Sequence, residues 1–253
     1  MRFTRNPRRS SSFSFQITST KNAMPLPPLT FAEVRQVDHD AIRQLGIPGL
    51  LLMENAARGA CQVIQRLGSL RRIVIVAGPG NNGGDGLAIA RLLAAGHLSS
   101  EVLLVRAGKS LSTDAQSNLA FLNATEIPVV DAGPDDVAQT LHDLSSEDLV
   151  IDALLGTGIR GVVASPFDTV IRTINNCSAQ VLAIDLPSGM NGDTGQPCGI
   201  CVQADSTVTF VAEKTGFRTA GARQFTGPVT VCHIGLPQQW LKKWYEAAVR
   251  DRS

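Results

Sequence analysis

The chain has 253 residues, 43% of them hydrophobic and 18% charged, and its formal net charge is +1. This composition is typical of one globular domain with a substantial core, and it excludes a chain that is disordered throughout. The near-neutral charge argues against nucleic acid as a partner, and no run of about 18 uncharged apolar residues predicts a membrane span.

The first 32 residues contain no acidic side chain and are rich in arginine, serine and threonine, as organellar transit peptides are. Residues 1–27 are therefore predicted to be a flexible leader or transit-like tail, followed by one domain over 28–248. Two interpretations of the tail remain open. Residues 1–23 are either a transit peptide, which implies the mitochondrial matrix, or an unstructured extension upstream of a start at Met24.

Two helices are expected next. Thr30 and Glu33 form a capping box, and apolar residues then recur at helical spacing, at Val34, Val37, Ala41 and Leu45, until Gly46 ends the helix. A second helix is predicted over 51–67, with Gly68 placed to stop it.

The pattern then changes to short β-branched runs separated by helix-length segments, at 73–76, 102–105, 149–151 and 181–184. This alternation predicts a Rossmann-like three-layer α/β/α sandwich with a mostly parallel central sheet, because near-continuous apolar strands need burial on both faces. Two further strands, 207–211 and 229–234, are separated only by a loop, so we expect an edge hairpin.

A glycine-rich segment, residues 78–86, lies between the first strand and a helical run over 87–95. Ligands of open α/β sheets bind at the carboxyl ends of strands, where such a turn lets backbone N–H groups approach a phosphate. The segment lacks the Lys-Ser/Thr ending of a P-loop and offers Asn and Asp oxygens instead, which favours polar or cation coordination. A tight turn without a ligand is the plainer alternative, but five glycines are costly in conformational entropy for a mere turn.

Two other segments also begin where a strand ends, residues 152–161 and 183–193. Asp152 and Asp185 would therefore point at the same edge of the sheet as the glycine-rich segment. Each aspartate also has an interpretation that needs no ligand. Asp152 is then a cap or turn residue, and Asp185 is part of an Asx-type turn. Convergence of carboxylates at strand ends nevertheless favours general acid/base chemistry, with Asp185 beside Pro187-Ser188-Gly189 as the candidate.

Together the three segments resemble the YjeF N-terminal domain family, the NAD(P)H-hydrate epimerases that include apolipoprotein A-I-binding protein. The resemblance covers about residues 30–240 and takes in Leu52-Met53-Glu54-Asn55-Ala56 near the start and Lys214 near the end. It implies an isomerase that interconverts the R and S forms of hydrated NADH and NADPH (NAD(P)HX) and supplies the S epimer to a separate dehydratase. It also implies a homodimer.

The resemblance carries over site residues onto matching positions. It implies that NAD(P)HX is bound by Asn81, Asn82, Gly83, Gly84, Asp85, Gly156, Thr157, Gly158, Ile159, Arg160, Gly161, Val162 and Asp185. It further implies one K⁺ per subunit, bound by Asn82, Asp152 and Ser188. All three are hard oxygen donors, which suit an alkali cation. We expect Gly83 and Gly84 to let the backbone approach the dinucleotide closely.

The implied chemistry fits these residue types. A hydroxyl on the carbon beside the ring nitrogen leaves as water once it is protonated, because the nitrogen lone pair stabilises the resulting cation. Water that adds back to either face then gives the two epimers. One carboxylate, Asp185, would act as acid and then as base, so neither a histidine nor a covalent nucleophile is needed.

Three other features of the sequence bear on alternative kinds of site, and none of them favours one strongly. Cys198 and Cys201 have the spacing of a redox or metal pair, but a single pair is weak support for zinc, and free thiols are expected. The four histidines fall in none of the three segments, which argues against a serine hydrolase. Lys214 follows the strand that ends at Val211. A contact with a phosphate and a solvated lysine are equally plausible there, so Lys214 is left out of the catalytic assignment.

A non-catalytic ligand-binding or protein-interaction scaffold with the same fold remains the second hypothesis. Such scaffolds should lose the polar residues of the three segments, whereas Asn82, Asp152 and Asp185 are all present here. The sequence of residues 156–160 is more similar to that of bacterial-type members of the family, which favours a cytoplasmic location over the mitochondrial matrix.

Overall fold

The computed structural model describes residues 26–159 and 161–248, so most of the predicted leader and Arg160 lie outside the described residues. The described chain contains a seven-stranded sheet of order β3-β2-β1-β4-β5-β6-β7 in which every neighbouring pair is parallel. The strands are β1 (Ile73–Ala77), β2 (Glu101–Leu104), β3 (Val129–Asp131), β4 (Leu149–Ala153), β5 (Gln180–Ile184), β6 (Ser206–Phe210) and β7 (Val229–Cys232). The predicted Rossmann-like fold is confirmed.

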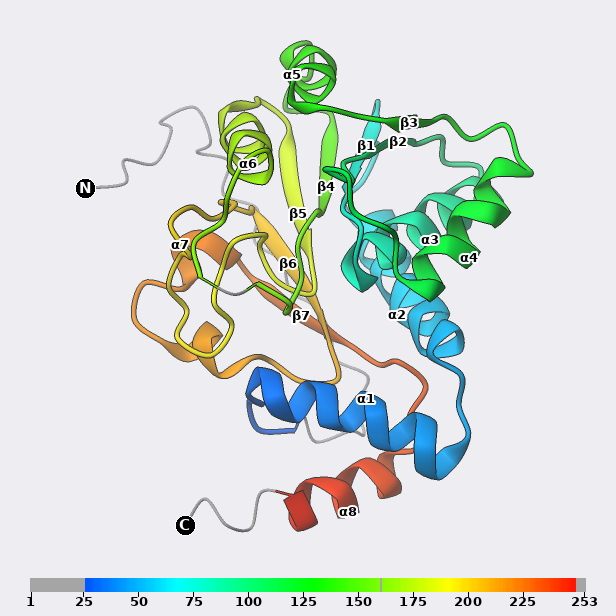
Figure 1. Cartoon of the computed structure of the whole chain (residues 1–253), viewed down its shortest axis with the longest axis vertical. Helices are drawn as coiled ribbons and strands as arrows, with labels where there is room; N and C mark the ends of the chain where they lie inside the picture. Colours follow the sequence, from blue (N-terminus) through cyan, green and yellow to red (C-terminus); the bar gives the residue numbers. More distant parts are fainter. Residues whose placement is uncertain (1–25, 160, 249–253) are drawn as a thin grey trace.

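Helices cover both faces of this sheet (Figure 1). One apolar cluster joins the sheet to α1 (Phe31–Leu45), α2 (Gly49–Gln65), α3 (Asn81–Ala95), α4 (Thr113–Asn123) and α8 (Gln238–Ala248). A second cluster joins the other face to α5 (Pro134–His142) and α6 (Phe167–Asn176). Alternate residues of one strand enter different clusters, since Ile75 faces the first and Val76 the second. Burial on both faces explains why the strands are almost wholly apolar.

The first helix begins and ends as predicted. Thr30 Oγ1 accepts a hydrogen bond from the Glu33 backbone N–H at 3.3 Å, and the Glu33 carboxylate accepts one from the Thr30 N–H at 2.7 Å. Gly46 ends the helix with φ 66°, a conformation that glycine adopts without steric cost. The second helix lies two residues closer to the N-terminus than predicted, over 49–65.

The predicted edge hairpin is wrong, because β6 and β7 pair in parallel. The connecting residues 211–228 contain a 3₁₀ turn, η1 (Thr215–Arg218), and a short helix, α7 (Arg223–Thr226). Parallel neighbours need a crossover connection rather than a tight turn. This segment supplies the crossover.

The glycine-rich segment is more helical than predicted, since α3 starts at Asn81 and not at Leu87. Likewise β4 continues through Ala153, so Asp152 lies inside the strand and not after it. In both cases tertiary packing overrides local propensity: Gly86 lies against Ile75 and Ala153, where a larger residue would collide with the sheet.

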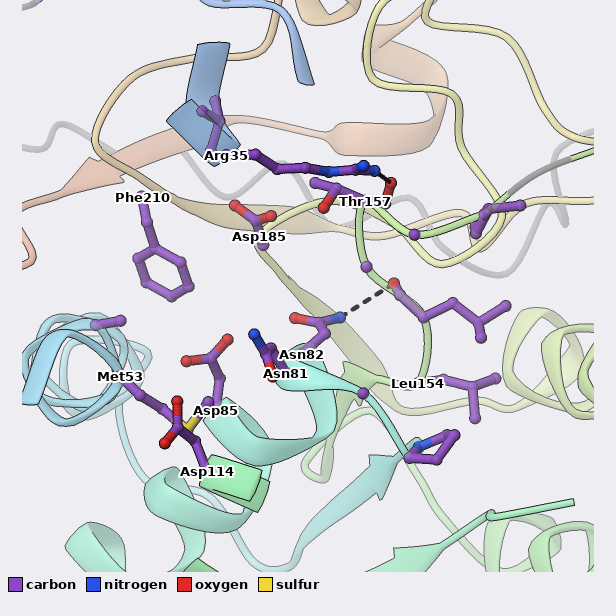
Figure 2. A pocket seen from close by; sticks show the side chains of 18 of the residues that line it. Arg35, Met53, Asn81, Asn82, Asp85, Asp114, Leu154, Thr157, Asp185 and Phe210 are labelled. Atoms are coloured by element: carbon purple, nitrogen blue, oxygen red, sulfur yellow. Dashed lines mark hydrogen bonds between the residues drawn. The ribbon is translucent and has the colours of Figure 1, made fainter. Parts of the chain in front are cut away.

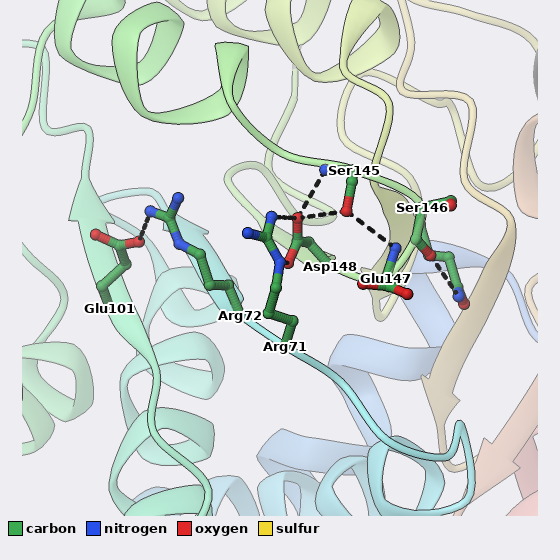
Figure 3. Close-up of polar contacts among 8 residues, drawn as sticks. Arg71, Arg72, Glu101, Ser145, Ser146, Glu147 and Asp148 are labelled. Atoms are coloured by element: carbon green, nitrogen blue, oxygen red, sulfur yellow. Dashed lines mark hydrogen bonds and ion pairs between the residues drawn. The ribbon is translucent and has the colours of Figure 1, made fainter.

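Polar contacts at the amino ends of the strands have a structural role (Figure 3). Arg71, just before β1, donates from Nε to the buried Asp148 carboxylate at 3.0 Å, and the Ser145 N–H donates to it at 2.6 Å. Burial opposes ionisation of Asp148, but these bonds outweigh it and lower the pKa of that carboxyl. These contacts stabilise the edge of the sheet opposite the three predicted segments. No helix of the described residues is long and apolar enough to span a membrane.

Candidate active site

A cavity of about 820 Å³ lies at the carboxyl ends of β1, β4, β5 and β6 (Figure 2). The strand order reverses between β1 and β4, and α/β sheets bind ligands at such a switch point. The volume falls in the range of about 300 to 1,000 Å³ that is typical of small-molecule sites. All three segments singled out in the sequence contribute to its walls, together with α1 and α2.

Most of the residues expected to bind substrate line this cavity. They are Asn81, Asn82, Asp85, Gly156, Thr157, Gly158, Ile159, Val162 and Asp185. Gly83, Gly84 and Gly161 are not among the lining residues, and Arg160 lies outside the described residues. Helix α1 holds the second segment in place, because the Arg35 guanidinium donates to the Thr157 carbonyl at 2.6 Å.

The structure gives a different reason for the glycines at positions 83 and 84. A Cβ on Gly83 would lie 1.8 Å from the Gly78 carbonyl oxygen, and one on Gly84 would lie 2.7 Å from Met53 Cε of α2. Both positions therefore face protein atoms, and neither has a positive φ. The absent side chains let α3 approach its own N-terminal loop and α2. The expectation that they make room for the dinucleotide is corrected in this respect.

Asp185 follows β5 directly and has a left-handed backbone, with φ 64°. Its N–H donates to the Val208 carbonyl at 2.7 Å, which fixes the bend, and such strained conformations cluster at functional sites. The carboxylate accepts a hydrogen bond from Thr209 Oγ1 at 3.3 Å and forms an ion pair with Lys214. The bend presents this carboxylate to the cavity.

Lys214 was missed as a site residue. Its side chain has no solvent exposure, and the ammonium group contacts the Asp185 carboxylate and, at 2.8 Å, Thr209 Oγ1. A buried lysine needs a counter-charge, and Asp185 supplies it. The signals in the sequence were its inclusion in the family resemblance and its place shortly after an apolar strand, and the second of these is shared by a solvated lysine.

Asp38 of α1 was also missed. It lines the cavity from the helix face that carries Val34 and Val37, and a charged residue on an apolar face was the available signal. Burial, and then repulsion from Asp185, raise the pKa of Asp38 to about 6, although Lys214 opposes the shift.

The three predicted potassium ligands meet around Leu155. The Asp152 carboxylate accepts from the Ser188 N–H at 2.8 Å and from Ser188 Oγ at 2.5 Å, and Ser188 Oγ accepts from the Leu155 N–H at 2.8 Å. Asn82 Nδ2 donates to the Leu155 carbonyl at 3.1 Å. Asn82 Oδ1 is buried and has no hydrogen-bond partner among the described residues. An unsatisfied amide oxygen, a buried carboxylate and a hydroxyl, on three residues that all approach Leu155 or its neighbours, are the hard oxygen ligands that suit an alkali cation.

The cysteine pair lies apart from this chemistry. Cys198 is half-buried and Cys201 is buried, both are free thiols, and neither lines the cavity. Burial raises the pKa of both thiols, which disfavours the reactive thiolate. Trp244 of α8 is buried and donates from its indole to Asp40 at 2.8 Å, so it joins α8 to α1 as a packing residue.

Comparison with known proteins gives consistent results. A family model described as the N-terminus of YjeF-related proteins matches residues 49–216. The NAD(P)H-hydrate epimerase of Rhodopirellula baltica is 38% identical over 224 residues, 88% of this chain and 91% of that protein. The epimerase of Pirellula staleyi is 39% identical over 83% of this chain and 92% of its own length.

Two further comparisons are informative. The bifunctional NAD(P)H-hydrate repair enzyme of Salinibacter ruber is 34% identical over 87% of this chain but only 43% of its own length. The crystal structure of yeast ynu0 has the same fold, with a TM-score of 0.70 and 22% identity over 87% of this chain and 93% of that chain.

Proposed function

The chain belongs to the family of YjeF-related N-terminal domains, and we propose that it is an isomerase that epimerises hydrated NADH and NADPH. Relatives named as NAD(P)H-hydrate epimerases are similar to it over most of both chains. The observation that carries the proposal is the Asp185 carboxylate, which lies on a strained bend, forms an ion pair with a buried lysine and lines a cavity large enough for a nucleotide.

The site has the parts that this reaction needs. Loss of the hydroxyl as water leaves a positive charge on the carbon and nitrogen of the nicotinamide ring. A fixed carboxylate beside that ring stabilises the developing cation, and it does so without reorganisation because its orientation is already set. Asp185 occupies this position in the proposal. Gly80, at the N-terminus of α3, lines the cavity and would place backbone N–H groups near the pyrophosphate.

We propose that K⁺ is bound by Asn82, Asp152 and Ser188, one ion per subunit. The buried Asn82 Oδ1 without a partner supports this assignment. When bound, the ion would neutralise Asp152 and hold the glycine-rich segment against the residues after β4. The proton chemistry stays with the side chains in the cavity.

The finer assignments are part of the same proposal. The protein would act as a homodimer in the cytoplasm, and a dehydratase on a separate chain would consume the S epimer. The bifunctional repair enzyme of Salinibacter ruber supports a functional link between epimerisation and a further repair step, because this chain matches less than half of it.

The direct test supplies purified protein with one epimer of NADHX and follows conversion to the other by chromatography. We expect conversion to the equilibrium mixture at a rate proportional to protein concentration. A preparation that binds ADP-ribose by calorimetry yet leaves the epimer ratio at the protein-free rate would support the scaffold hypothesis instead.

A further inference from the structure

We propose that two carboxyl groups divide the chemistry: Asp85 gives its proton to the departing hydroxyl, and Asp185 stays ionised and stabilises the cation. This inference rests on the proposed epimerase function. It replaces the hypothesis that Asp185 alone acts as acid and then base.

The ion pair with Lys214 argues against Asp185 as the acid. Lys214 has no solvent exposure, and its other contacts are to a hydroxyl and a carbonyl oxygen. Protonation of Asp185 would break the one ion pair that the buried ammonium makes among the described residues, which is strongly unfavourable. The proton donor must therefore be another group in the cavity.

Asp85 has the geometry of such a donor. The residue is only 8% exposed, it lines the cavity, and Figure 2 shows its side chain pointing from α3 into the space below Asp185 and Phe210. Its carboxyl group makes no hydrogen bond among the described residues. A carboxyl group that lines the cavity and has no partner in the protein is free to bond with a ligand.

The surroundings of Asp85 favour its neutral form. Burial, and then repulsion from Asp185 and from Asp38 of α1, raise its pKa well above the ordinary value, and Asp114 of α4 adds to this. Lys214 opposes the shift but is already paired with Asp185. The helix dipole favours a negative charge only in the first turn of α3, and Asp85 lies beyond that turn. A carboxyl group whose neutral form is favoured in this way can act as a proton donor.

The proposed step balances. The Asp85 proton moves to the hydroxyl oxygen, the carbon–oxygen bond breaks with its electron pair on oxygen, and the ring nitrogen lone pair forms a carbon–nitrogen double bond. Asp185 faces the resulting cation. Water then adds to the other face of the ring and gives up a proton to solvent, and solvent returns a proton to the Asp85 carboxylate, so that protons balance over the cycle. No oxidant or reductant is consumed.

The test compares Asp85→Asn with the wild type on one epimer of NADHX. An amide keeps the size and the hydrogen-bond donor but has no acidic proton, so kcat should fall about a hundredfold to ten-thousandfold while KM stays within about threefold. Calorimetric titration with ADP-ribose should give the same Kd for both proteins, because Asp85 acts on the nicotinamide ring.

A pH profile supplies a second readout. Wild-type kcat should decline as the pH rises and Asp85 loses its proton. Asp38→Asn removes a negative charge that helps Asp85 keep its proton, so this decline should begin at lower pH. A purely structural role of Asp85 would not produce this shift.

The outcomes separate the two proposals. A wild type that leaves the epimer ratio unchanged refutes the epimerase function. An active wild type together with Asp85→Asn at about the same kcat, within threefold, overturns the role of Asp85 and leaves the function intact. If Asp85→Asn does not fold, the pH profile decides. The inference is overturned if kcat declines with rising pH at the same pH in Asp38→Asn as in the wild type.

Discussion

The ammonium group of Lys214 and the carboxylate of Asp185, which lines the cavity, form an ion pair in which the lysine side chain is fully buried and the aspartate is partly exposed. Lys214 follows β6 and Asp185 follows β5, so the pair joins the carboxyl ends of two neighbouring strands. It fixes the orientation of the carboxylate, because Asp185 is the one group among the described residues with which Lys214 forms an ion pair.

This pairing predicts non-additive effects on stability. Asp185→Asn leaves a buried ammonium unpaired and should lower the free energy of unfolding by about 1 to 3 kcal/mol, less than for a wholly buried pair. The double variant with Lys214→Met should recover part of this loss. Urea denaturation of both single variants and the double variant measures the coupling. Additive losses would mean that the two groups do not interact in solution.

Asp185→Asn should also abolish epimerisation, because a neutral amide cannot stabilise the cation of the ring. We expect a loss of about a hundredfold or more in kcat with the fold retained in circular dichroism. The double variant Cys198→Ser with Cys201→Ser is the control, since neither thiol lines the cavity, and its activity should equal that of the wild type. Asp185→Asn at nearly full activity would exclude the residue from the mechanism.

Potassium should stabilise the protein through the site at Asn82, Asp152 and Ser188. A ligand that binds only the folded state raises stability by about 2.7 kcal/mol at a hundred times its Kd. Melting in potassium chloride should therefore occur at higher temperature than in the chloride of a bulky organic cation at equal ionic strength. In Asn82→Ala the difference should shrink, because the variant loses the unsatisfied amide oxygen. Identical wild-type melting curves in the two salts would argue against the site.

The glycines of α3 should be sensitive to size for packing reasons. Gly84→Ala places a Cβ against the flexible end of Met53 and should cost about 1 kcal/mol, whereas Gly84→Val should cost about 1 to 3 kcal/mol. Gly83→Ala should be more damaging, because its Cβ would meet the backbone oxygen of Gly78. Chemical denaturation ranks the three variants. A fully stable Gly83→Ala would show that the loop can move away.

Asp38 should make stability depend on pH. Its pKa is raised in the folded state to about 6, so its favourable contribution is complete below the unfolded value near 4 and is lost as the pH rises through about 6. Asp38→Asn should therefore exceed the wild type in stability at about pH 8, by up to roughly 3 kcal/mol, with the difference vanishing near pH 4. Thermal melts at both pH values test this, and an equal difference at each would contradict it.

Much of the fold could be predicted from the sequence, because its signals are local. The capping box of Thr30 and Glu33 involves neighbouring residues, and β-branched runs that alternate with helix-length segments require a parallel sheet with two covered faces. The same logic placed Asp152 and Asp185 at one edge of the sheet. It failed for β6 and β7, since the pairing direction depends on the path of the whole connection and not on the two strands.

The sequence by itself also determined the family, through three segments whose residue types and spacing match together. Only the tertiary structure decided which charged groups share the cavity and how strongly their surroundings favour the protonated form. Asp38 and Asp85 become neighbours of Asp185 when α1 and α3 pack at the carboxyl ends of the strands, and Lys214 becomes a counter-charge only when it is buried. Burial and the distance between charges set protonation, and both are properties of the folded chain rather than of any local pattern.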